Sequence, residues 1–396
     1  MAFPKPALGK TSLRDTRNSM YELNLDIAHF LEHYWQKRPL LIKGGFKDFQ
    51  DPISPDELAG LAMEEVVESR LVTRFDGKWD AAHGPFESYD HLGEENWTIL
   101  VQACNHWAPE VNELAVPFQF IPGWRFDDVM VSFSTPHAGV GPHIDNYDVF
   151  ITQGQGKRHW RVGDAKPLNE FAAHAALLHC EPFVEAIIDV IMEPGDILYI
   201  PPGFPHEGYA IEPSMNFSVG FRAPDAKALI SSFADHLIDN EVRTERYGDA
   251  DLKPRARHGE IQPHELHRLR ELMQQALDDE TLFKEWFGTM ISEAKHDLDV
   301  NPVEPDYSAE EVADLLTQGE PAIKVPGLRT VWFSGESQQC FIDGEAWTLQ
   351  SEDAAAISLL CDKDIITQAD MVELADQAGF LQLLTRLVNR GYWFFN

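Results

Sequence analysis

The sequence predicts an α+β chain whose centre is a β-rich sandwich or barrel. From about Val129 to Arg222, short apolar runs such as "DVMVSFS", "YDVFITQG" and "SMNFSVGFR" alternate with Gly and Pro turn signals. Several short strands with closely spaced turns are typical of an antiparallel sandwich or barrel. Helical periodicity follows Pro224, and the segment from Tyr307 onward mixes short helices and strands. These patterns predict three regions, residues 1–223, 224–297 and 298–396.

The amino-terminal elements are two helices, each followed by a strand. The run "LNLDIAHFLEHYWQKRPLLIKGGF" predicts a helix that ends near Lys37–Arg38 and a short strand closed by Gly44–Gly45. In "SPDELAGLAMEEVVESRLV", Ser54 suits the N-cap, Pro55 suits the first helical position, and Glu57 completes a capping box. The run "RLVTRF" then predicts a strand.

The second and third regions are predicted from apolar periodicity and from proline. Periodic apolar positions predict helical structure in "AKALISSFADHLIDN" and in "PHELHRLRELMQQALDDETLFKEWFGTMISEA". The Pro-rich acidic stretch "KHDLDVNPVEPDYS" marks a boundary. Beyond it, "SAEEVADLL", "DAAAISLL", "QADMVELA" and a final helix accompany strands in "TVWFSG" and "QQCFIDG", which resembles a winged-helix arrangement. Because this segment is acid-rich, we expect a protein-contact or structural role for it.

Composition and charge restrict the classes of function. The 396 residues are 44% hydrophobic and 24% charged, with a formal net charge of −33. So acidic a protein repels a phosphate backbone, which argues against direct binding of nucleic acid. The charge serves solubility alone, or it attracts a basic macromolecular partner, and composition leaves both open.

The sequence contains no signal for a membrane or an oxidising compartment. The amino-terminal segment pairs no basic region with an apolar run, so we expect no signal peptide. No uninterrupted apolar stretch is long enough to span a bilayer. Four widely spaced cysteines, Cys104, Cys180, Cys340 and Cys361, form no CxxC motif. We therefore expect free thiols in a reducing cytoplasm.

The stretch "GPHIDNYDVF" carries the strongest chemical signal. Alternation along a strand places His143 and Asp145 on one face. Alone, this pair is weak evidence for a metal site, and a hydrogen-bonded polar pair or an ordinary exposed strand is the more common explanation. Downstream, "EPGDILYIPPGFPHEG" delivers His206 just after a rigid Pro/Gly turn. Two imidazoles and one carboxylate form the 2-His-1-carboxylate triad, which leaves positions open on an octahedral Fe(II).

A cationic side chain accompanies this triad. Arg158, in "QGQGKRHWRVG", lies fifteen residues beyond His143, on what we expect to be the neighbouring strand. Its planar guanidinium matches a carboxylate through two hydrogen bonds. A dicarboxylate co-substrate would chelate the metal at one end and meet Arg158 at the other. The alternative interpretation of Arg158 is an ordinary surface arginine. A role in binding the co-substrate is favoured if Trp160 also faces inward.

Small polar residues and glycines surround these motifs. Ser132 and Ser134 share one strand face, and Asn216 lies in a similar polar stripe. These residues are either ordinary strand polars or hydrogen-bond partners of the co-substrate. We expect Gly139 and Gly141 to allow close backbone approach to the site, and Gly141 and Pro142, directly before His143, to leave room for a co-substrate at the barrel mouth.

The order of "YWQKRPLLIKGG", "SFSTPHAGVGPHIDNYDVFITQGQGKRHWRVG" and "PGDILYIPPGFPHEGYA" resembles the bacterial ribosomal oxygenases, which are JmjC-type hydroxylases. The resemblance covers essentially the whole chain and is most specific in the central motifs. It implies a JmjC/cupin double-stranded β-helix (jelly-roll) barrel with N-terminal helices. A helical dimerisation region at 224–297 and a winged-helix-like C-terminal domain would follow. One departure is His137–Ala138, where the family tends to be richer in glycine.

The resemblance also implies a reaction and the residues that perform it. The two histidines and the aspartate would hold Fe(II), and Arg158 would bind the distal carboxylate of 2-oxoglutarate, helped by Ser132 and Ser134. With O2, this site would hydroxylate an arginine of large-subunit ribosomal protein sixteen. The protein would be a homodimer with a basic ribosomal protein as its substrate. Asn146 and Tyr147, directly after the HxD motif, are the positions we expect to meet that substrate.

Three alternatives remain open. The chain is also compatible with a hydroxylase of histidine or asparagine in another ribosomal protein, which the sequence separates only by overall likeness. A JmjC demethylase would use the same triad on methylated lysine or arginine. A cupin-like scaffold that binds protein without catalysis would not consume 2-oxoglutarate.

Overall fold

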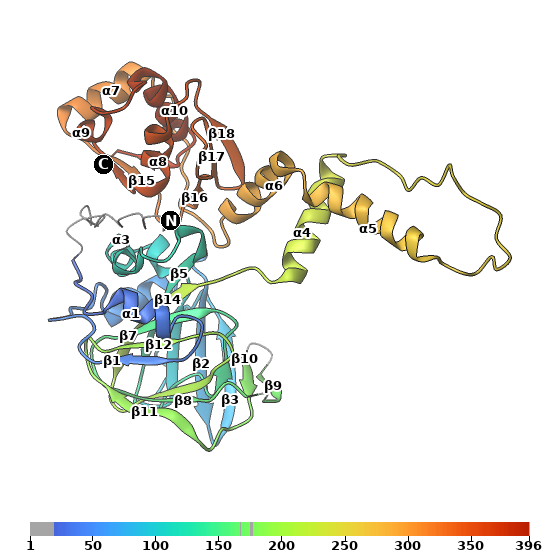
Figure 1. Cartoon of the computed structure of the whole chain (residues 1–396). Coiled ribbons are helices and arrows are strands. Elements are labelled where there is room, and N and C mark those ends of the chain that lie inside the picture. The colour runs from blue at the N-terminus through green and yellow to red at the C-terminus, as the bar shows by residue number, and fades with distance from the viewer. Residues whose placement is uncertain (1–19, 167, 175–176, 396) are drawn as a thin grey trace, which may run out of the picture.

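The computed structural model describes residues 20–166, 168–174 and 177–395. Figure 1 shows a β-rich amino-terminal body, a helical arm that projects from it, and a carboxy-terminal domain over the end of the body near α3 (Pro109–Asn112). In the described part of the chain, no helix is long and apolar enough to cross a membrane.

Eight antiparallel strands form the larger sheet of the body. Their order across the sheet is β1 (Leu40–Ile42), β12 (Ile197–Ile200), β7 (Asp148–Gln153), β14 (Ser214–Phe221), β5 (Phe126–Ser134), β4 (Trp97–Val101), β2 (Ser69–Phe75) and β3 (Lys78–His83). All of β7 is buried, because Phe150 packs under the amino-terminal helices and Ile151 faces the second sheet. A strand that is covered on both faces typically has a nearly continuous apolar sequence.

The second sheet has four strands and faces the first. Its order is β11 (Ala186–Met192), β8 (Arg158–Gly163), β13 (Pro205–Ala210) and β6 (His143–Ile144). Trp160, Val162 and Met192 of this sheet pack on Leu198 and Ile200 of the larger one. Two antiparallel sheets around one core form a jelly-roll, so the predicted barrel is confirmed. A hairpin of β9 (Glu170–His174) and β10 (Leu177–Cys180) lies beside β6.

Short helices cover the outer face of the larger sheet. These are α1 (Ile27–His33), α2 (Pro55–Leu61) and α3. Phe30 of α1 is fully buried, and its ring centroid lies 4.9 Å from that of Tyr199. The predicted capping box is present at α2, where Ser54 and Glu57 satisfy each other's backbone N–H groups. Helix α1 ends at His33, before the predicted Lys37–Arg38, and the side chains of these two residues donate to its last carbonyls.

Three helices form the arm, α4 (Ala226–Asp239), α5 (Pro263–Leu277) and α6 (Glu280–Ser292). The helical pattern predicted over residues 263–294 is present as two helices, because helix α5 ends at Leu277 and α6 begins after Asp279. That residue caps α6, because its carboxylate accepts from Leu282 N at 3.1 Å. Phe233 and Trp286 form a small core where the helices meet, and α5 reaches away from the body (Figure 1).

The carboxy-terminal domain combines helices with two small sheets, as the predicted winged-helix arrangement requires. Its helices are α7 (Ala309–Gln318), α8 (Ala354–Asp362), α9 (Gln368–Met371) and α10 (Gln377–Asn389). One sheet contains β19 (Ile365–Ile366), β15 (Ala322–Lys324) and β20 (Trp393–Phe394), and the other contains β16 (Thr330–Val331), β17 (Gln339–Ile342) and β18 (Glu345–Thr348). Trp393 and Phe380 are fully buried in its core.

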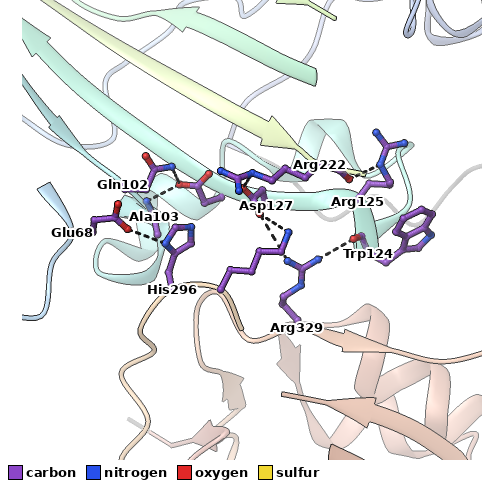
Figure 2. A network of polar contacts seen from close by, with 11 residues as sticks. Glu68, Gln102, Ala103, Trp124, Arg125, Asp127, Arg222, His296 and Arg329 are labelled. Atoms are coloured by element: carbon purple, nitrogen blue, oxygen red, sulfur yellow. Dashed lines mark hydrogen bonds and ion pairs between the residues drawn. The ribbon is translucent and has the colours of Figure 1, made fainter. Parts of the chain in front are cut away.

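One carboxylate joins the three regions (Figure 2). Asp127, at the start of β5, has a side chain that is only 3% exposed. It pairs with Arg222 Nε at 2.5 Å, just after β14, and with Lys295 Nζ at 3.1 Å, just after α6. Arg329 of the carboxy-terminal domain brings Nη1 to 4.0 Å and donates from Nη2 to Trp124 O at 2.9 Å. Asp127 therefore ties the arm's base and the carboxy-terminal domain to the body.

Candidate metal centre

The structure brings His143, Asp145 and His206 together. His143 on the edge strand β6 pairs in register with His206 on β13, and Asp145 follows β6 directly. Asp145 Oδ2 lies 3.9 Å from His143 Nε2 and 3.6 Å from His206 Nε2. The three ligand atoms lie within 4.8 Å of one another, close enough to share one metal ion. The three residues of the predicted triad are therefore placed so that they could hold one metal ion.

Backbone carbonyls orient both imidazoles. His143 Nδ1 donates to Gly141 O at 2.9 Å, and His206 Nδ1 donates to Phe204 O at 3.0 Å. These bonds place the proton on Nδ1 and leave each Nε2 lone pair for a metal. Burial, with a smaller contribution from His143, lowers the pKa of His206 to about 4. His206 is thus neutral near pH 7, which is the form that binds a metal.

The two sequence motifs are tied to each other through the backbone. Gly203, in the Pro-Pro-Gly turn before β13, donates its N–H to Asp145 O at 2.8 Å. Its φ of 85° lies in the left-handed region, where glycine is unstrained. The turn that delivers His206 therefore also fixes the position of Asp145.

Arg158 is a buried cation without a counter-ion. It is 5% exposed, and burial lowers the pKa of its guanidinium to about 9. Its Nη2 donates to Ser134 Oγ at 2.6 Å, while Nε has no hydrogen-bond partner and no carboxylate pairs with it among the described residues. Trp160 is buried on the same inward face, as the site hypothesis requires. A buried cation in this state is a preformed site for an anion.

The position of Arg158 in the sheet differs from the prediction. Its strand β8 is the neighbour of β13, which carries His206, and β13 lies between β8 and the strand of His143. Strand adjacency depends on contacts between distant segments, so the spacing of fifteen residues did not reveal it. The guanidinium still faces the same interior as the triad, because inward positions alternate along both strands.

The predicted polar stripes line this interior, with additional residues that the sequence did not single out. Ser132 and Asn216 are paired in register and buried, and Asn216 Oδ1 has no hydrogen-bond partner in the described structure. The prediction missed Ser214, whose Oγ accepts from Arg158 at 3.4 Å. It also missed Thr98, whose hydroxyl lies 2.8 Å from that of Ser134. Strand alternation alone could have identified Ser214, since it lies two residues before Asn216 on the same face of β14.

Gly139 and Gly141 allow other groups to approach their backbone closely, as expected, but the expectation that Gly141 leaves room for a co-substrate is wrong. A Cβ at Gly139 would lie 2.1 Å from Gly208 O, and one at Gly141 would lie 2.4 Å from the His179 ring. The space that these residues leave is therefore filled by the protein itself and provides no room for a co-substrate. Gly141 also has a φ of 81°, which independently favours glycine.

The two predicted substrate positions lie beside the triad. Asn146 is exposed in the turn that follows Asp145. Tyr147 is partly buried; its hydroxyl donates to the side chain of Asp145, and burial raises its pKa well above the usual value. The guanidinium carbon of Arg222 lies 5.4 Å from the ring centroid of Tyr147. Their contact with a substrate stays a prediction.

Comparison with known families matches two segments of the chain. Residues 113–229 match the JmjC domain, and residues 271–394 match the ROXA-like winged helix. The first segment contains the triad and Arg158, and the second contains the carboxy-terminal domain.

Similarity to individual proteins extends over nearly the full length. The ribosomal protein uL16 3-hydroxylase of Escherichia coli K12 is 50% identical over 375 residues, 95% of this chain and 99% of that protein. The Haemophilus influenzae protein named "Probable ribosomal oxygenase" is 30% identical over 366 residues, 88% and 89% of the two chains.

Solved structures agree with this similarity. The X-ray structure of E. coli ycfD superposes with a TM-score of 0.90 at 50% identity, covering 95% of this chain and 100% of that chain. The E. coli ribosomal oxygenase YcfD in complex with cobalt and 2-oxoglutarate has a TM-score of 0.86 at 50% identity, with 95% and 99% covered. The jelly-roll, the metal-binding geometry and the identity over nearly all of both chains place this protein in the family of JmjC-type ribosomal oxygenases.

Proposed function

We propose that this protein is an Fe(II)- and 2-oxoglutarate-dependent dioxygenase that hydroxylates an arginine side chain of large-subunit ribosomal protein sixteen. The observation that carries this proposal is a metal-binding triad that shares an interior with the buried, unpaired guanidinium of Arg158. The names of the relatives support it, since one is a uL16 3-hydroxylase and a related structure contains cobalt and 2-oxoglutarate.

Each polar group of the site has a task in this reaction. Bound Fe(II) would offer open positions for 2-oxoglutarate and O2, so that O2 could oxidise 2-oxoglutarate to succinate and CO2 with one oxygen atom and place the other in an unactivated C–H bond. The triad holds the metal on one face, while Arg158 and Ser134 hold the distal carboxylate of 2-oxoglutarate. Ser132 and Asn216 offer further hydrogen bonds along the same wall. Trp160 and its apolar neighbours keep the interior dry.

Charge and an aromatic side chain favour a cationic substrate. The net charge of −33 attracts a basic ribosomal protein toward this molecule. The ring of Tyr147 already carries one guanidinium, that of Arg222, on its surface. Tyr147 and the exposed Asn146 are therefore the residues that we assign to contact with a substrate arginine. The cytoplasm is the location we expect, in keeping with four cysteines that are all free.

The proposal is tested by incubating the protein with Fe(II), 2-oxoglutarate and purified large-subunit ribosomal proteins. We expect one oxygen atom to be added to an arginine of protein sixteen, mapped by tandem mass spectrometry. His143→Ala and Asp145→Ala should abolish this product while circular dichroism stays unchanged, because each variant removes a metal ligand from a folded barrel. A hydroxylated product formed at the wild-type rate by either variant contradicts the metal assignment.

The same assay separates the alternatives. Oxygen on a histidine or asparagine of another protein identifies a hydroxylase of different specificity. Loss of a methyl group from a methylated peptide identifies a demethylase. Absence of succinate with every substrate, together with a melting temperature insensitive to metal and 2-oxoglutarate, identifies a binding scaffold without catalysis.

We also propose that the arm forms a homodimer. Helix α5 carries an apolar stripe whose side chains are each between 44% and 71% exposed, Leu266, Leu269, Met273 and Leu277. Spacings of three and four residues put them on one helical face, next to the buried Ala276. An exposed stripe of this kind on a projecting helix is suited to a second copy of the same arm.

A further inference from the structure

We propose that His179 is a positioning residue that holds the metal ligand His143 in its binding orientation. The inference rests on the proposed function, since it concerns the same metal site. His179 lies on β10, outside the triad and outside every motif that the sequence singled out. Its imidazole is 3% exposed and contacts the loop that leads into β6.

His143 needs support from outside its own sheet. It is the first residue of β6, a strand of two residues at the edge of the second sheet. The ladder to β13 holds β6 on one side only. The orientation of the imidazole depends on Gly141 O, which accepts the proton of His143 Nδ1 at 2.9 Å. Whatever fixes the peptide at Gly141 therefore also fixes the direction of His143 Nε2.

Strand β10 fixes the backbone on both sides of that peptide. His179 Nε2 lies 2.7 Å from Val140 O, and because a carbonyl only accepts, the imidazole donates. Two residues further along the loop, Pro142 O accepts from Cys180 N at 2.9 Å. Two bonds that flank Gly141 leave its carbonyl little freedom to rotate away from His143.

The imidazole ring of His179 also packs against the backbone of Gly141. A Cβ at Gly141 would lie within 2.4 Å of His179 Cε1, so the ring packs directly on the glycine backbone. This close approach, together with the positive φ of Gly141, explains why a glycine stands two residues before the ligand. His179 orients the loop through one hydrogen bond and one van der Waals surface.

His179 itself is held firmly. The ring of Trp79 on β3 meets it edge-on at 4.9 Å between centroids, and Phe171 on β9 lies at 6.1 Å. Burial lowers the pKa of His179, so the ring is neutral with a single N–H, which is committed to Val140 O. That commitment, and its place outside the ligand cluster, exclude His179 as a fourth metal ligand.

The test measures metal affinity as well as activity. We expect His179→Ala to weaken Co(II) binding on the order of tenfold, measured by isothermal titration: loss of the direct partner of a ligand histidine costs about 10- to 100-fold, and His179 acts on that partner, Gly141 O, through the loop. His179→Gln keeps an N–H donor of similar reach and should restore most of the affinity. His159→Ala is the matched control, since that imidazole lies on the outer face of β8, paired with Asp189. If His179→Ala fails to fold, His179→Asn, whose amide is too short to reach Val140, takes its place.

The outcomes separate a positioning role from a merely structural one. Equal Co(II) affinity for wild type and the Ala or Asn variant, even with a lower melting temperature, overturns the inference. Failure of His179→Gln to recover affinity also overturns it. Because Co(II) binding is measured without a protein substrate, absence of hydroxylation by the wild type counts against the proposed function and leaves this result interpretable.

Discussion

At the scale of single residues, the guanidinium of Arg158 determines how tightly 2-oxoglutarate is held. It is buried, its Nε lacks a partner in the described residues, and burial lowers its pKa to about 9. A carboxylate bound there gains charge-assisted hydrogen bonds and removes the cost of an unpaired buried cation. Arg158→Ala removes both contributions, about 2–3 kcal/mol in total.

We therefore expect Arg158→Ala to raise the KM for 2-oxoglutarate roughly 30- to 150-fold. The measurement is the rate of succinate formation as a function of 2-oxoglutarate concentration. Arg161→Ala is the control, because this guanidinium lies on the opposite face of the same strand and pairs with Glu207. An unchanged KM in the Arg158 variant contradicts its assignment to the co-substrate.

Site residues could be predicted from the sequence where a short motif identifies them. His143 and Asp145 are two positions apart, and a Pro-Pro-Gly turn lies shortly before His206. Gly141 was misinterpreted, because the ring that fills its space comes from His179, nearly forty positions away along the chain. Identifying Ser214 would have required only the alternation already applied to Asn216.

At the scale of elements, the exposed apolar stripe of helix α5 is the surface that we expect a partner to cover. Its apolar stripe faces neither the small core of the arm nor the body. Figure 1 shows the connection between α4 and α5 running beside and beyond α5, and ion pairs of Arg255 with Glu265 and of Arg268 with Asp251 join the two, but the four apolar side chains of the stripe stay exposed. Association with a second copy would bury the stripe and stabilise both helices, because short helices depend on tertiary packing.

We expect the double variant Leu269→Glu, Met273→Glu to be monomeric at concentrations at which the wild type is dimeric. Burying two carboxylates in the interface would cost more free energy than the remaining apolar contacts contribute to association. Light scattering coupled to gel filtration gives the mass directly. Gln275→Glu, on the opposite face of α5, adds a charge without entering the stripe and should leave the mass unchanged. A monomeric wild type at all concentrations contradicts the dimer.

Element boundaries were predictable where a local signal fixed them. The capping box of Ser54 and Glu57 marks α2 correctly, because both hydrogen bonds form within one turn. The break before Asp279 was missed, since apolar periodicity runs on across it and only the aspartate cap reveals it. The strand order β8–β13–β6 could not be read from spacing, because it is set by how distant hairpins pair.

For the whole molecule, the junction at Asp127 determines whether the three regions move as one. Arg222 and Lys295 are nearly half exposed, with 47% and 41% of the side chain accessible, whereas Arg329 is only 11% exposed. Arg329 is the most buried of the three cations, and burial lowers the pKa of its guanidinium, whereas the nearby charge of Asp127 raises it. Neutralising Asp127 removes the carboxylate with which Arg222, Lys295 and Arg329 all pair.

Asp127→Asn should therefore release the carboxy-terminal domain while the barrel stays folded. Removing one partner of a buried ion pair costs several kcal/mol, and we expect about 2 kcal/mol here because two of the cations regain water. That change corresponds to roughly 30-fold faster proteolysis of the connection at residues 293–308, if cleavage follows the opening of the junction. Asp306→Asn, which removes an exposed charge in the same connection, is the control. Equal cleavage rates for Asp127→Asn and wild type would mean that apolar contacts, rather than this carboxylate, hold the domain in place.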